Sequence, residues 1–142
     1  MASAQSLSLA DRRIVAAWAS DCAERVLPLF EQEAPRDGRP RDAVARTRAF
    51  SRGEIDAAGE IRRRFVAGRA AAAVTAPAAV AAARAAAQAA GVAHMGAHAL
   101  AAVRLALRQL PALGSDSAGP LGAGLLAVGD LGEAIRRLQA AL

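Results

Sequence analysis

Alanine dominates this sequence, most plainly between Ala70 and Ala83, where only alanine, valine, threonine and one proline occur. Alanine loses no side-chain entropy on entering a helix and therefore has the highest helix propensity. β-branched residues are sparse and never alternate with polar residues, as half-buried strands would require. The sequence therefore predicts an all-α protein.

The small number of large side chains limits how such helices can pack. Aromatic residues make up 3% of the 142 residues, and tyrosine is absent. A chain of this length is one domain's worth and can bury a core, which here must come from close helix–helix approach. We expect a single-domain helical bundle of about five to seven helices.

Capping signals place the first helix. Ser8, with Asp11 three residues later, predicts an N-cap, and the apolar spacing then continues to about Glu33. Pro28 removes one backbone hydrogen bond and clashes with the preceding turn, so a kink or break is expected there.

Prolines and glycines divide the rest of the chain. Further helices are expected from Pro40 to Gly53, from Glu54 to Val74, from Pro77 (capped by Thr75) to Gly91, and from Val92 to Leu110. The helix that starts at Val92 is apolar on most of its circumference, which is typical of a central helix. Residues 114–120 predict a loop, and Asp130 with Glu133 predicts the cap of a last helix.

These segments give a domain organisation of three parts. We expect an N-terminal tail over residues 1–8, a helical core over 9–110, and a loop with a C-terminal helix packed on the core over 111–142. The pattern Ala43-Val44-Ala45-x-x-Arg48-Ala49 recurs 36 residues later as Ala79-Val80-Ala81-x-x-Arg84-Ala85. This recurrence is compatible with a repeated helical pair, and equally with chance in a chain so rich in alanine.

The basic charge is concentrated in one segment. All 18 basic residues are arginine, and the net charge is +5. Residues 36–69 hold ten arginines and five acids, whereas the remaining eight arginines meet eight acids. Because lysine, interleaved aromatics and a recognised nucleic-acid motif are missing, an acidic protein is the expected partner rather than nucleic acid. A solvated helix face is the alternative; the candidate contact residues are Arg39, Arg41, Arg48 and Arg52.

The most individual stretch runs from Trp18 to Glu31 and includes the single tryptophan and the single cysteine. Helical spacing places Trp18 and Cys22 in the core, because a lone cysteine in an apolar stripe usually packs. Asp21 lies beside Trp18 on the side expected to be buried, where a carboxylate needs a partner. We expect that partner to be His94, His98 or an arginine of the second helix.

Two sets of residues could in principle bind a metal or catalyse a reaction. His94 and His98, spaced i, i+4, would share a helix face as in many zinc sites, with Cys22, Asp21 or Glu24 as further ligands. The alternative is that the histidines hydrogen-bond within the core. Cys22 with a histidine and Asp21 could form a nucleophile and base, but no nucleophile turn or oxyanion-hole pattern accompanies it. We therefore expect no enzyme, no cofactor and no metal.

Cellular location follows from two further features. Cys22 alone cannot form an internal disulfide, and residues 1–8 lack the charged and apolar regions of a signal peptide. The apolar run from Ala70 to Ala83 is too short to span a bilayer. A cytoplasmic protein without a membrane partner is expected, and the sequence is compatible with a homodimer.

A set of motifs, in order along about residues 9–107, resembles the family-five-like immunity proteins of bacterial polymorphic toxin systems. They are Asp11-Arg12-Arg13, Trp18-Ala19-x-Asp21-Cys22-Ala23-Glu24-Arg25-Val26-Leu27-Pro28-Leu29-Phe30-Glu31, Arg39-Pro40-Arg41 with Ala43, Arg48-Ala49-Phe50, Arg52-Gly53-Glu54-Ile55, Ala93-His94-Met95 and His98-Ala99. Phe50 stands where a tryptophan is usual, and the histidine often found near Gly68-Arg69 is missing from this sequence.

This resemblance implies a helical bundle that neutralises a partner toxin by tight, non-catalytic binding. The binding residues expected from the residues and the resemblance together are Trp18, Asp21, Arg39, Arg41, Arg48, Arg52, His94 and His98. The alternative is a small helical module that binds a ligand or metal through His94, His98 and Asp21.

Overall fold

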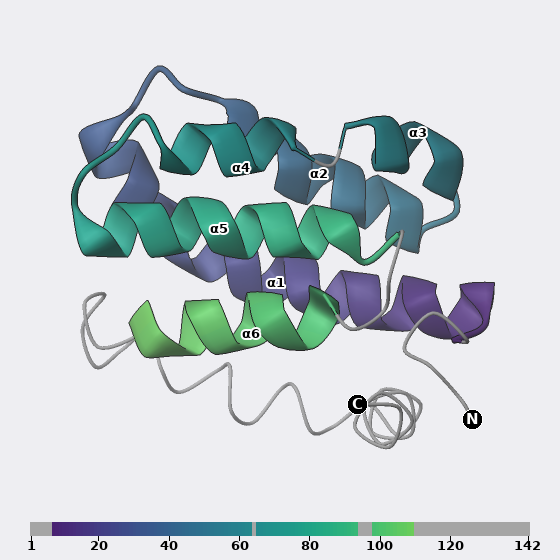
Figure 1. Cartoon of the computed structure of the whole chain (residues 1–142). Helices are drawn as coiled ribbons and strands as arrows, with labels where there is room; N and C mark the ends of the chain where they lie inside the picture. Colours follow the sequence, from purple (N-terminus) through teal and green to yellow (C-terminus); the bar gives the residue numbers. More distant parts are fainter. Residues whose placement is uncertain (1–6, 64, 94–97, 110–142) are drawn as a thin grey trace.

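The computed structural model describes residues 7–63, 65–93 and 98–109, and these residues form six α-helices and no strand (Figure 1). The helices are α1 (Leu9–Glu33), α2 (Arg39–Ser51), α3 (Ala57–Arg62), α4 (Val66–Ala71), α5 (Pro77–Gly91) and α6 (His98–Gln109). The prediction of an all-α, single-domain bundle of five to seven helices is confirmed. The predicted loop and last helix lie outside the described residues, and the three-part division of the chain stays a prediction.

Both expected signals at the ends of the first two helices are present. The Asp11 N–H donates to Ser8 Oγ at 3.0 Å, so Ser8 caps α1. At the end of α2, Gly53 adopts a φ of 76°, and the N–H groups of Gly53 and Glu54 donate to Phe50 O (3.0 Å) and Ala49 O (2.9 Å). This pair of bonds is a Schellman motif, which favours glycine because its left-handed residue carries no Cβ.

Of the kink or break expected at Pro28, the break does not occur, because α1 continues through Pro28 to Glu33. Two other expectations about the helices are wrong. The single helix expected over 54–74 is two short helices, α3 and α4, whose junction carries short-range bonds from Arg63 N to Glu60 O and from Val66 N to Arg63 O. Gly59 and Gly68 each lower helix propensity by about 1 kcal/mol, which weakens one continuous helix. Val92 is in a turn, and the helix expected to start there starts at His98.

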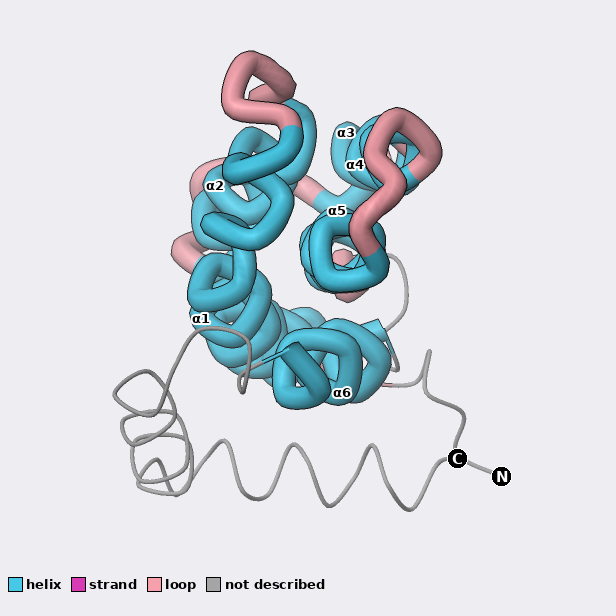
Figure 2. Tube along the Cα trace, turned by 90° about the vertical axis from the view of Figure 1, so that its left-hand side faces the viewer, coloured by secondary structure: helices cyan, strands magenta, loops and turns pink. Residues whose placement is uncertain are grey.

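The central helix is α5, and not the following helix as the sequence predicted. α5 contacts each of the other five helices. Figure 2 places α1 and α2 at the left, α5 to their right beneath α3 and α4, and α6 at the bottom. The side chains of α5 that are buried are all alanines: Ala79, Ala82, Ala83, Ala85, Ala86, Ala89 and Ala90. Because a methyl group needs little space, neighbouring helices approach α5 closely from several sides.

The start of α5 is capped from a distance, and not by Thr75 as expected. The Glu33 carboxylate, at the end of α1, accepts from Thr75 N (2.7 Å), Thr75 Oγ1 (2.9 Å) and Ala76 N (3.0 Å). The hydrogen bonds from the Thr75 and Ala76 amides hold the pKa of Glu33 below its usual value. This contact ties the end of α1 to the entry of the central helix.

Larger side chains fill the space between α1 and its neighbours. The largest fully buried ones include Phe30, Phe50, Leu27, Val15, Val26 and Val92. Phe50 and Val44 are buried, so α2 turns its apolar face onto the core. Among the helices described, none is both long and apolar enough to cross a bilayer.

Candidate binding surface

The four arginines expected to contact a partner each meet a carboxylate of the same molecule. Arg39 pairs with Asp37 (Nη2–Oδ2 2.6 Å), and Arg52 pairs with Glu54 through two bonds of 2.7 and 3.0 Å. Arg41 and Arg48 reach from α2 to acids of α1. The arginine-rich face predicted on α2 is therefore largely neutralised from within.

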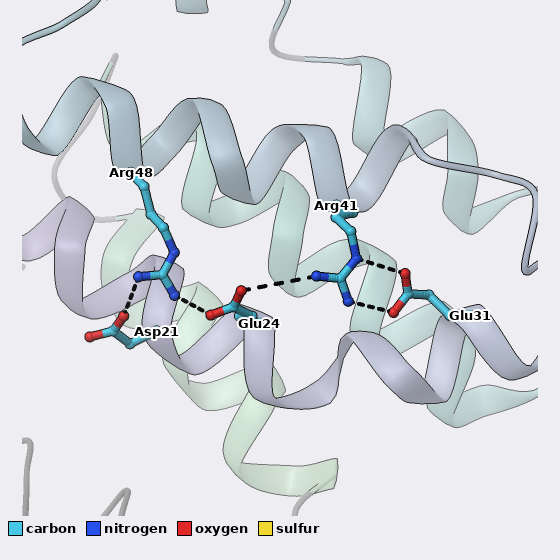
Figure 3. Close-up of polar contacts among 5 residues, drawn as sticks. All are labelled: Asp21, Glu24, Glu31, Arg41 and Arg48. Atoms are coloured by element: carbon cyan, nitrogen blue, oxygen red, sulfur yellow. Dashed lines mark hydrogen bonds and ion pairs between the residues drawn. The ribbon is translucent and has the colours of Figure 1, made fainter.

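The contacts of Arg41 and Arg48 form an ion-pair ladder between α1 and α2 (Figure 3). Arg41 binds both carboxylate oxygens of Glu31, at 2.8 and 2.6 Å, and its Nη1 lies 4.0 Å from Glu24 Oε1. Arg48 bridges Asp21 (Nη1–Oδ1 2.8 Å) and Glu24. The hydrogen bond from Arg41 lowers the pKa of Glu31.

Helical periodicity accounts for this ladder. Arg41 and Arg48 are seven residues apart and so lie on one face of α2, while Asp21, Glu24 and Glu31 follow one face of α1. The two helices run antiparallel, which brings Arg48 to Asp21 and Arg41 to Glu31. Each exposed pair contributes at most about 1 kcal/mol, but the ladder fixes the register of α2 on α1.

Asp21 has the predicted kind of partner but not the predicted environment. Its partner is Arg48, an arginine of the second helix as expected. However, the Asp21 side chain is 57% exposed and not buried beside Trp18. The cause is its position on the α1 face that borders α2, where solvent still reaches the carboxylate.

Trp18 and Cys22 belong to the core. Trp18 is 8% exposed, and its indole Nε1 finds no hydrogen-bond acceptor among the described residues. Cys22 is fully buried, and burial together with the neighbouring Asp21 raises the pKa of its thiol to about 12. A thiol with this pKa stays protonated at neutral pH and is a poor nucleophile.

His98 is held in a packing role. An amide oxygen only accepts, so the ring donates its Nδ1–H to Gln88 Oε1 on α5. A Cβ added at Gly91 would lie 2.9 Å from the His98 ring, so the ring occupies the space that a side chain at position 91 would need. His94 lies outside the described residues, and the described part of the chain contains no cluster of three or more potential metal ligands.

Two polar contacts were not found by sequence reasoning. Glu60 is 3% exposed, and its Oε1 accepts from Arg46 Nε (2.9 Å) and lies 2.6 Å from Arg46 Nη2. Arg12 Nη1 donates to Ala93 O at 2.8 Å and so links α1 to the turn after α5. Both pairs are distant in sequence, so no local spacing indicates them.

Comparison with protein families gives one match, to the family described as "Imm-5 like putative immunity protein", over residues 5–118. This span covers well over half of the 142 residues. The chain belongs to this immunity protein family. Comparisons with curated proteins and with solved structures return no match.

This membership confirms the resemblance drawn from the motifs. It indicates a role in binding, of the kind that immunity proteins have. The matched span contains all six described helices, including the α1–α2 ladder and the alanine-packed α5. Within that span, the structure joins Asp21 to α2 and His98 to α5, through separate contacts.

Proposed function

We propose that this protein is a non-catalytic immunity protein that neutralises a partner toxin by binding to it in the cytoplasm. The observation that carries the proposal is the family match over residues 5–118. A single-domain helical bundle supports it, because a surface that is already folded loses less conformational entropy on binding than a segment that must become ordered.

The proposed partner is acidic. The net charge of +5 comes entirely from arginine, whose planar guanidinium binds carboxylates through two parallel hydrogen bonds. Complementary charge accelerates association and disfavours wrong partners, both of which matter for a protein that must intercept a toxin.

The chemistry of the two candidate reactive groups supports binding over catalysis. The Cys22 thiol is buried and protonated, and the His98 ring is packed against Gly91 and hydrogen-bonded to Gln88. Neither group is placed to activate a substrate.

The test uses the toxin encoded beside this protein's gene. Co-expression of this protein with the toxin should restore the growth of cells that the toxin alone inhibits, and the two proteins should co-purify as a stoichiometric complex. An unrelated immunity protein serves as the control. Inhibition should saturate at one equivalent, and the toxin should be recovered chemically unmodified after denaturing separation. Lack of protection by the soluble protein refutes the proposal, and complete inhibition by a small fraction of an equivalent indicates an enzyme instead.

A further inference from the structure

The stretch between Glu60 and Asp116 contains no acidic residue. It holds seven arginines, so its formal charge is 7 − 0 = +7, while the other eleven arginines meet thirteen acids, giving −2. This stretch includes all of α4, α5 and α6. The net basic charge of the molecule therefore lies in this stretch, and four of its arginines are on α4, α5 and α6. The seven arginines are Arg62, Arg63, Arg64, Arg69, Arg84, Arg104 and Arg108.

Four arginines of this stretch have no ion-pair partner among the described residues. Arg63 pairs with Asp42 at 3.0 Å. By contrast, Arg69, Arg84, Arg104 and Arg108 are exposed and form no ion pair within the part of the chain that the structure describes. A guanidinium without an internal carboxylate exerts its full charge on an approaching partner.

An exposed aromatic side chain lies at the edge of this basic region. Phe65, immediately before α4, is 60% exposed, and in the described residues Leu9 is the other large hydrophobic side chain that is exposed. Aromatic and arginine side chains are the types that most often dominate the binding energy of protein interfaces.

Small side chains lie where α4 meets α5. α4 and α5 lie side by side in both views (Figures 1 and 2). A Cβ added at Gly68 would lie 4.0 Å from the Ala87 methyl group, so the two helices meet through their smallest side chains. Gly68 and Ala72 of the α4 segment are exposed. A partner can therefore approach the α4 backbone closely beside Arg69.

We propose that Phe65, Arg69 and Arg84 form the docking surface for an acidic protein partner, which inserts Phe65 into an apolar contact and pairs carboxylates with the two arginines. This inference rests on the proposed function and locates its binding site on α4 and α5. A protein fits better than nucleic acid because the exposed arginines are spread over separate helices and, in the described residues, Phe65 is the one exposed aromatic side chain among them. Nucleic-acid strands are usually bound by several stacking aromatics along a groove.

The test measures the dissociation constant for the toxin encoded beside this protein's gene, with Phe65→Ala, Arg69→Glu and Arg84→Glu. Each should weaken binding about tenfold or more, as expected for residues at the centre of an interface. Arg25→Glu is the matched control, because Arg25 is also exposed and without an ion pair in the described residues but lies on α1; it should change binding less than about threefold. Circular dichroism and thermal unfolding should be used to check that each surface variant is folded.

The outcomes separate this inference from the proposed function. If the toxin binds the wild type and all variants equally, the surface assignment fails and the immunity function stands. If the toxin does not bind the wild type, both fail. Three further results would overturn the inference: tight binding of duplex DNA that the Arg variants abolish, self-association that they abolish, or tighter toxin binding on removal of residues 111–142 without any effect of Phe65, Arg69 or Arg84.

Discussion

The pair formed by Arg46 and Glu60 offers a direct test of how ion pairs act in this fold. Arg46→Met keeps most of the apolar stem of Arg46 but removes the guanidinium. It leaves the Glu60 carboxylate, which is 3% exposed, without the group that donates to it. Breaking a fully buried pair costs about 3–5 kcal/mol, because the remaining charge is neither solvated nor paired.

The expected cost here is smaller, at about 2 kcal/mol, because the Arg46 side chain is 32% exposed and water reaches one side of the pair. Arg52→Met is the matched control. It breaks the pair between Arg52 and Glu54, whose side chains are 57% and 54% exposed, and should cost much less than Arg46→Met because water solvates both charges.

The measurement is urea-induced unfolding of the wild type, Arg46→Met, Arg52→Met, Glu60→Leu and the Arg46→Met/Glu60→Leu double variant. Arg46→Met should cost much less when Glu60 is already leucine, so the cycle should give a coupling free energy of about 1–2 kcal/mol. Equal losses from Arg46→Met and Arg52→Met, or additive losses in the cycle, would refute the argument from burial.

Three further predictions concern packing, reactivity and pH. Gly91→Ala should destabilise the fold by about 1–2 kcal/mol, because the new methyl group would lie 2.9 Å from the His98 ring. Gly68→Ala, the control, should be neutral or should stabilise the fold by up to about 1 kcal/mol. Urea unfolding that shows Gly91→Ala to be stabilising would contradict this prediction. Cys22, buried and with a pKa of about 12, should react with a thiol reagent only after unfolding, and rapid labelling of the native protein would disprove that burial. The pKa values of Glu31 and Glu33 lie below 4.5 in the folded state, so their contribution to the stability of the fold is complete above that pH and is lost as the pH falls through the lowered values. The urea midpoint should therefore drop between about pH 5 and about pH 3. A midpoint independent of pH would contradict these contacts.

Local signals predicted the parts of the fold that depend on neighbours in sequence. Ser8 begins α1 and Gly53 ends α2 through hydrogen bonds between residues at most five apart, so spacing alone identifies them. The cap of α5 comes from Glu33, 42 residues from Thr75, and no local pattern indicates it. For the same reason, Thr75 was wrongly expected to cap that helix.

Side-chain hydrophobicity alone does not identify the central helix of this fold. α5 is central for a geometric reason: alanine permits close approach on several sides. The helix that ends at Gln109 has more large apolar residues but contacts mainly α1 and α5.

Charge counted along the sequence does not show which arginines have a carboxylate of the same molecule beside them. The excess over residues 36–69 ignored acids from α1, and Glu31, Glu24 and Asp21 neutralise Arg41 and Arg48 across the helix pair. The stretch free of acids after Glu60 is readable from the sequence. Its significance depends on the fold, because only the fold determines which arginines have carboxylates nearby.

The most direct test of the account is hydrogen–deuterium exchange of this protein with and without the toxin encoded beside its gene. Toxin binding should slow exchange in the segment from Phe65 through α4 and in the exposed turns of α5, and leave α2 unchanged. Protection centred on Arg41 and Arg48 of α2, with no change at α4 and α5, would contradict the account.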